Sequence, residues 1–165
     1  MIVVIMGVSG SGKSTIGGLL AERIGTVFAD ADDFHPQANK DKMAAGHPLN
    51  DEDRQPWLED LNRLLKSWYE GSGSGVLACS ALKEKYRDTL KTGIPEGKVH
   101  FVLLEGDPKL IEERMKARPG HYMKANMLAS QIATLEVPAD ALKVKNIGPP
   151  EEVVTGILRD LTAKG

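Results

Sequence analysis

Residues 2–14 read Ile2-Val3-Val4-Ile5-Met6-Gly7-Val8-Ser9-Gly10-Ser11-Gly12-Lys13-Ser14, and the architecture of the chain follows from this stretch. Its first five residues form a continuous apolar run, typical of a strand buried on both faces of a parallel sheet. The next eight match G-x-x-x-x-G-K-[ST], and apolar residues then recur at helical spacing from Ile16 to Ile24. A glycine loop between a buried strand and an amphipathic helix predicts a phosphate-binding P-loop.

The chemistry of this loop indicates a nucleoside triphosphate and magnesium. Glycines let successive backbone N–H groups turn inward around a phosphate, and the helix N-terminus adds its positive dipole end. Lys13 can reach the β- and γ-phosphates, which makes it a catalytic candidate, and the Ser14 hydroxyl can bind Mg²⁺. The predicted ATP-binding residues of the loop are Gly7, Ser9, Gly10, Ser11, Gly12, Lys13 and Ser14.

The rest of the chain predicts an α/β fold. Further short strands are expected at 26–29, 76–79, 99–104 and 142–147, separated by helical stripes such as the one from Trp57 to Trp68. Parallel strands need crossover connections, so this order predicts a five-stranded, mostly parallel sheet with helices on both faces. Three stretches resist regular assignment: 47–56, 71–75 and 118–124. Trp57 and Trp68 are expected to pack in the core or at a hinge, and the alternative is that they serve as stacking platforms.

Composition limits the class of protein and its partners. The 165 residues suit a single domain, 1–165, with 41% hydrophobic and 27% charged residues. A net charge of −2 favours no nucleic acid partner, and no apolar run approaches the ~20 residues of a membrane span. One cysteine, Cys79, forms no intramolecular disulfide and is expected to be buried. These features favour a soluble protein of the reducing cytoplasm.

Acidic residues stand at an unusual place for a P-loop protein. The strand expected at 76–79 ends in Cys79-Ser80-Ala81, without the aspartate that often supports magnesium there. Asp30 and Asp32 instead follow the strand expected at 26–29, with two carboxylates on one side of an extended segment. They could orient metal-bound water or an acceptor hydroxyl. The alternative is a solvated acidic turn that caps a helix.

Two arginines could complete the charge around the phosphates. Arg114 and Arg118 lie four residues apart, on one helical face, and Pro119-Gly120 follows at a predicted hinge. Phosphoryl transfer depends on such positive charge, although a charged helix terminus would show the same spacing. The residues to this point leave a kinase, a switch GTPase and a motor ATPase open.

Beyond the P-loop, several segments carry a more selective pattern. They are Asp30-Ala31-Asp32-Asp33-Phe34-His35-Pro36, Pro48-Leu49-Asn50-Asp51-Glu52-Asp53-Arg54 with Pro56-Trp57-Leu58, Leu77-Ala78-Cys79-Ser80-Ala81-Leu82-Lys83 with Tyr86-Arg87-Asp88, Gly120-His121-Tyr122-Met123, and Ser130-Gln131 ahead of Leu135-Glu136 and Pro138. With these segments the chain resembles the gluconokinase family, a branch of the small-molecule kinases related to shikimate and nucleoside monophosphate kinases. The resemblance covers nearly the whole length.

The resemblance implies ATP-dependent phosphorylation of D-gluconate to 6-phospho-D-gluconate. It implies a three-layer P-loop fold like that of nucleoside monophosphate kinases, with an acceptor-binding helical region at about 35–70 and a mobile lid at about 118–126. The resemblance is also compatible with a homodimer. A kinase of the same fold acting on shikimate or a nucleoside monophosphate is the alternative.

The resemblance also implies roles for individual residues. Asp32 would orient or deprotonate the acceptor hydroxyl, Asp30 would join Ser14 at magnesium, and Arg118 would act in catalysis. Thr15, Arg114 and Arg118 would join the P-loop in binding ATP. The implied substrate-binding residues are Asp32, His35, Arg54, Lys83, Arg87, His121 and Gln131. The alternatives without a role in binding are that His35 shapes the turn before Pro36, and that Arg54 pairs with a neighbouring aspartate on the surface.

Overall fold

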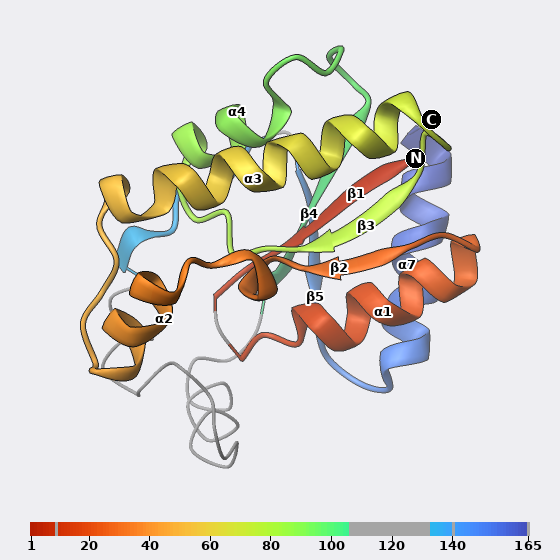
Figure 1. Ribbon diagram of the computed structural model, residues 1–165. Coiled ribbons are helices and arrows are strands. Elements are labelled where there is room, and N and C mark those ends of the chain that lie inside the picture. The colour runs from red at the N-terminus through yellow and green to blue at the C-terminus, as the bar shows by residue number, and fades with distance from the viewer. Residues whose placement is uncertain (9, 106–132, 140, 165) are drawn as a thin grey trace.

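The computed structural model describes residues 1–8, 10–105, 133–139 and 141–164 and contains a five-stranded parallel sheet (Figure 1). The strand order is β2-β3-β1-β4-β5, and all four pairings are parallel. The strands are β1 (Ile2–Met6), β2 (Phe28–Asp30), β3 (Gly75–Ala78), β4 (Val99–Glu105) and β5 (Leu142–Lys145). The predicted α/β class and five-stranded parallel sheet are confirmed.

Helices cover both faces of this sheet. The helices among the described residues are α1 (Lys13–Ile24), the 3-10 helix η1 (Ala31–Phe34), α2 (Gln37–Ala44), α3 (Asp51–Glu70), α4 (Glu84–Lys91) and α7 (Pro150–Lys164). In Figure 1, α3 and α4 lie on one face and α1 and α7 on the other. Each pair packs on its own apolar cluster. Every residue of β1 is at most 1% exposed, because the strand lies in the centre of the sheet between these clusters.

The start of α3 corrects the sequence prediction. Residues 47–56 were expected to be irregular, but the helix begins at Asp51. Asn50 accepts a hydrogen bond from the backbone of Asp53, and the Asp53 carboxylate accepts one from the backbone of Asn50, which forms a capping box. Pro56 then lies inside the helix on its exposed side, where water can reach the carbonyl group that its missing N–H leaves unpaired.

Two edge strands also differ from their predicted bounds. β2 begins at Phe28, opposite Val76, so the strand starts two residues later than predicted. β5 ends at Lys145, two residues earlier than predicted, and the side chain of the next residue, Asn146, donates to the P-loop. Apolar pattern alone does not show where a neighbouring strand stops.

The remaining core predictions are confirmed. Trp57 is buried and Trp68 packs on the edge of the same cluster. Cys79 is buried, and burial raises the pKa of its thiol to about 12.

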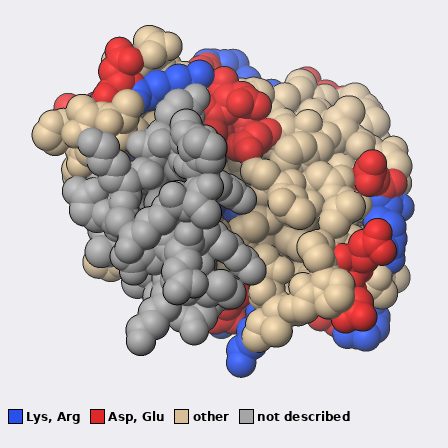
Figure 2. Space-filling model, turned by 90° about the horizontal axis from the view of Figure 1, so that it is seen from below, with Lys and Arg blue, Asp and Glu red and all other residues tan. Residues whose placement is uncertain are grey.

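Within the described ranges, every helix is too short or too polar to cross a membrane. On the face seen in Figure 2, acidic and basic side chains are interspersed, and the described residues there form no continuous basic surface.

Candidate functional site

The P-loop joins the carboxyl end of β1 to the start of α1. Gly12 has a φ of 95°, and a Cβ atom there would lie 2.4 Å from Nδ2 of Asn146. That Asn146 nitrogen donates to the carbonyl oxygen of Ser11 at 2.7 Å. Lys13 Nζ donates to the carbonyl oxygen of Val8 at 3.0 Å, so the lysine folds back across the loop. The loop is therefore held from both sides, and only glycine fits at position 12 without strain.

Ser14 and Asp30 form a pair of oxygen ligands beside the P-loop. The Ser14 hydroxyl donates to Oδ2 of Asp30 at 2.5 Å, and Oδ1 of the same carboxylate accepts from the backbone N–H of Asp32 at 3.0 Å. Asp30 is the last residue of β2 and caps η1, which holds its carboxylate at this edge of the sheet. Hydroxyl and carboxylate oxygens are ligands that Mg²⁺ prefers.

No cluster of three or more metal-binding side chains occurs among the residues described. Magnesium in kinases does not need such a cluster, because Mg²⁺ is held there by one or two protein groups together with phosphates and water. The Ser14–Asp30 pair has the right donor chemistry for that limited role.

Asp32 and His35 lie on the segment that follows Asp30. His35 Nε2 lies 3.9 Å from Oδ1 of Asp32, whose side chain is 57% exposed. The imidazole ring stacks on the indole of Trp57, with ring centroids 4.2 Å apart and planes inclined by 12°. Trp57 Nε1 donates to the carbonyl oxygen of Ala31 at 2.7 Å, which ties η1 to α3. A carboxylate that solvent can reach thus stands beside a ring held by packing.

Burial keeps His35 neutral. Its pKa falls from the usual 6.5 to about 4, first because the ring is desolvated and then because Arg54 and Lys40 are nearby, while Asp30 acts in the opposite direction. An imidazole without charge can donate one hydrogen bond and accept one. At neutral pH this side chain therefore works through its hydrogen bonds.

Several cations gather where α3 begins and β3 ends. Asp51 Oδ1 accepts from Lys83 Nζ at 3.2 Å and from the Tyr86 hydroxyl at 2.5 Å, and Lys85 contacts Oδ2 of Asp51. Arg54 donates to the Tyr86 hydroxyl at 3.0 Å. The lysines and Tyr86 hold the pKa of the Asp51 carboxyl well below its usual range. This network orders Arg54 and Lys83 at the edge that carries the P-loop.

Arg54 does not make the surface pairing that the sequence allows, and Arg87 is buried. Arg54 donates to the carbonyl oxygen of Leu49 at 2.7 Å and does not pair with a neighbouring aspartate. Arg87 is 5% exposed, and its Nη1 donates to the carbonyl oxygen of Ala81 at 2.8 Å. Ala81 has a φ of 45°, an uncommon value for a residue with a Cβ atom. Arg87 thus supports the turn after β3.

Part of the predicted site lies outside the described residues. The residues of the predicted site that are not described are Ser9, Arg114, Arg118, His121 and Gln131, and the lid expected at about 118–126 is not described either. Thr15 is described and lies exposed in the first turn of α1.

Sequence reasoning missed two asparagines that the fold brings to the site. Asn146 could have been noticed as a polar residue directly after an apolar strand, at the edge where ligands bind in parallel sheets. Asn39, four residues after His35 on α2, carried no such signal. Its side chain reaches both His35 and the start of α3.

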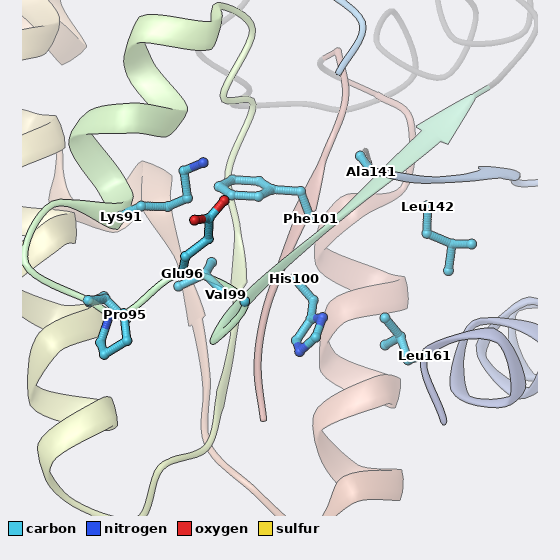
Figure 3. A pocket seen from close by; sticks show the side chains of 11 residues that line it. Lys91, Pro95, Glu96, Val99, His100, Phe101, Ala141, Leu142 and Leu161 are labelled. Carbon is cyan, nitrogen blue, oxygen red and sulfur yellow. The ribbon is translucent and has the colours of Figure 1, made fainter. Parts of the chain in front are cut away.

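A cavity of about 440 Å³ lies at the opposite edge of the sheet, where β4 begins (Figure 3). Its lining includes Leu142 and Phe101, and Lys91 Nζ lies 5.8 Å from the centroid of the Phe101 ring. Ile2 of β1 pairs with Val99 of β4 in parallel register, so this is the amino end of the sheet. The cavity is therefore separate from the P-loop edge.

Comparisons with known proteins identify relatives of this chain. The sequence model of the family described as shikimate kinase matches residues 9–162. A thermoresistant gluconokinase from Escherichia coli (strain K12) is 44% identical over 161 residues, covering 95% of this chain and 91% of that protein. A gluconokinase from Gluconobacter oxydans (strain 621H) is 39% identical, covering 98% of this chain and 92% of that protein.

Solved structures show the same likeness. A gluconokinase from Sinorhizobium meliloti 1021 matches with a TM-score of 0.83 and 40% identity, covering 98% of this chain and 91% of that one. A shikimate kinase from Aquifex aeolicus matches with a TM-score of 0.60 and 21% identity, covering 99% of this chain and 98% of that one. The second match shows a shared fold, whereas the first extends to the sequence.

Proposed function

The chain belongs to the gluconokinase family of shikimate-kinase-like P-loop proteins, and on this basis we propose that it transfers the γ-phosphoryl group of ATP to D-gluconate, forming 6-phospho-D-gluconate. One structural observation carries the proposal: the Ser14–Asp30 hydrogen bond joins the P-loop to the segment that holds Asp32 and His35. The phosphate site and the groups suited to an acceptor hydroxyl therefore share one edge of the sheet.

The P-loop side would bind the nucleotide. Backbone N–H groups of the loop and Lys13 would hold the phosphates, and Ser14 with Asp30 would hold Mg²⁺. Magnesium, when bound, would neutralise charge on the phosphates. By the family resemblance, Arg114 and Arg118 would contribute further positive charge at the transferred group.

The other side would bind the acceptor. Asp32 is exposed enough to accept the proton of a gluconate hydroxyl while that oxygen attacks the γ-phosphorus. Arg54 and Lys83 are ordered by the Asp51–Tyr86 network and would attract the gluconate carboxylate. His35 would contact a hydroxyl, and Arg87, His121 and Gln131 would complete the acceptor site. We also propose that the protein works in the reducing cytoplasm, which its single cysteine, Cys79, favours.

An acceptor screen tests the proposal. Purified protein with ATP and Mg²⁺ is assayed for ADP release on gluconate, shikimate and nucleoside monophosphates, with the Lys13→Ala variant, purified in parallel, as a control for contaminating kinases. We expect the fastest turnover on gluconate, with 6-phosphogluconate as the product. Equal or faster turnover on another acceptor would refute the assignment, and nucleotide binding with slow hydrolysis and no acceptor would favour a switch protein.

A further inference from the structure

Asn39 is a buried asparagine that contacts the candidate acceptor site only through another side chain. It is 5% exposed on α2. Its Nδ2 atom lies 2.8 Å from the carbonyl oxygen of Asp53 and 3.3 Å from Nδ1 of His35. One amide nitrogen thus faces two acceptor positions.

The contact with Asp53 settles the orientation of the amide. A backbone carbonyl oxygen can only accept a hydrogen bond, so the atom of Asn39 facing it is the NH₂ group. An amide nitrogen can only donate, and its second hydrogen is directed at Nδ1 of His35. Nδ1 must then carry a lone pair, which places the single proton of the neutral ring on Nε2.

The ring cannot easily turn away from this arrangement. Trp57 stacks on its face, and the indole is itself tied to the carbonyl oxygen of Ala31. Nε2 consequently faces Oδ1 of Asp32 at 3.9 Å, close enough for a small shift or a bound hydroxyl to complete a hydrogen bond. The low pKa of His35 agrees with a neutral ring.

We propose that Asn39 is a positioning residue that holds His35 as the Nε2–H tautomer, so that His35 donates toward Asp32 and the acceptor hydroxyl while Asp32 alone takes the proton. This inference rests on the proposed kinase function. In the transfer step the acceptor oxygen bonds to the γ-phosphorus, the bond from that phosphorus to the β-γ bridging oxygen breaks, ADP leaves, and the hydroxyl proton moves to the Asp32 carboxylate. A histidine with its proton on Nε2 has no lone pair facing this site.

Nitrogen NMR of the full chain reads the tautomer directly. Long-range ¹⁵N–¹H spectra of histidine-labelled protein distinguish protonated from unprotonated ring nitrogens, and a His35→Asn variant assigns the signals. In the wild-type protein we expect His35 to be protonated at Nε2 and unprotonated at Nδ1. In Asn39→Asp a carboxylate that only accepts hydrogen bonds replaces the amide, and Nδ1 should become protonated.

Asn62 offers a matched control. It is also a buried asparagine, and its Nδ2 donates to two backbone carbonyl oxygens, those of Leu90 and Thr92, at 2.8 and 2.9 Å. Asn62→Asp therefore removes comparable hydrogen bonds without touching His35. We expect this variant to keep the wild-type tautomer.

Kinetics test the positioning role. For Asn39→Asp we expect kcat/KM for gluconate to fall by roughly tenfold or more, as when one hydrogen bond to a reacting group is lost, with the KM for ATP unchanged. Asn62→Asp should leave both values unchanged. A wild-type ring protonated at Nδ1, an unchanged tautomer in Asn39→Asp, or a changed tautomer with unchanged kcat/KM would each overturn the inference.

The wild-type spectrum decides the tautomer even if Asn39→Asp does not fold. It also separates this inference from the proposed function. A wrong acceptor would leave the tautomer as expected, whereas a wrong tautomer would leave gluconate turnover in place.

Discussion

Acid should destabilise this fold through His35. The side chain is 4% exposed, and its pKa of about 4 lies below the 6.5 of a solvated histidine. As the pH falls through 6.5, His35 binds a proton in the unfolded chain, whereas in the folded chain it binds one only near pH 4. The free energy of unfolding therefore decreases between these two pH values. At 1.36 kcal/mol per pKa unit, the loss is about 2 kcal/mol between pH 7 and pH 5 and about 3 kcal/mol by pH 4.

Urea unfolding of wild type and His35→Asn at pH 7, 6 and 5 measures this effect. The asparagine cannot titrate but still offers an oxygen to Asn39, and the other ionisable groups are common to both proteins. We expect the wild type to lose about 2 kcal/mol more than the variant between pH 7 and pH 5, whatever their difference at pH 7. His47→Asn, at an exposed histidine, should behave as wild type. Equal losses in wild type and His35→Asn would refute the reasoning.

Three further substitutions test the P-loop edge. Lys13→Ala should reduce kcat by at least about a hundredfold with an unchanged circular dichroism spectrum, because its charge serves the phosphates; near-normal turnover would contradict this role. Asp30→Asn should raise the Mg²⁺ concentration needed for half-maximal activity by roughly tenfold or more, since one carboxylate beside Ser14 is lost; an unchanged magnesium titration would argue against the metal role. Gly12→Ala should weaken ATP binding in calorimetry and destabilise the fold by about 1–3 kcal/mol, because its Cβ would push the Asn146 side chain away and because residue 12 has a positive φ. An ATP affinity equal to that of the wild type would show that the loop adapts to the substitution.

The P-loop and the fold class were predictable because their signals are local. Residues 2–6 are buried in β1 as their apolar run indicates, and the helix from Lys13 follows the glycines directly. Asp30 was proposed for the metal site because the end of β3 lacks an acid, and the structure brings its carboxylate to Ser14. That contact depends only on two strands ending at the same edge of a parallel sheet.

The start of α3 and the contacts of Arg54 were not predictable in the same way. Residues 47–56 were expected to be irregular, but the capping box of Asn50 and Asp53 stabilises the helix start, and Pro56 lies inside the helix. The alternative of an aspartate partner for Arg54 is not what the structure shows, because the side chain donates to the carbonyl oxygen of Leu49 and to the hydroxyl of Tyr86. Tyr86 lies 32 residues away, so only packing of α3 on α4 makes that contact.

The order of residues was enough to establish a P-loop, an α/β fold and the family, because glycine geometry, strand burial and short motifs act between neighbours in the chain. The tertiary structure decided which side chains act together. It places Asn146 against the P-loop residue Ser11, 135 residues away in the chain. In the same way, Trp57 and Asn39 hold the imidazole ring of His35 beside Asp32. Such contacts depend on how elements distant in the chain pack, and hydrogen-bond direction, tautomer and pKa are set only once that packing has excluded water.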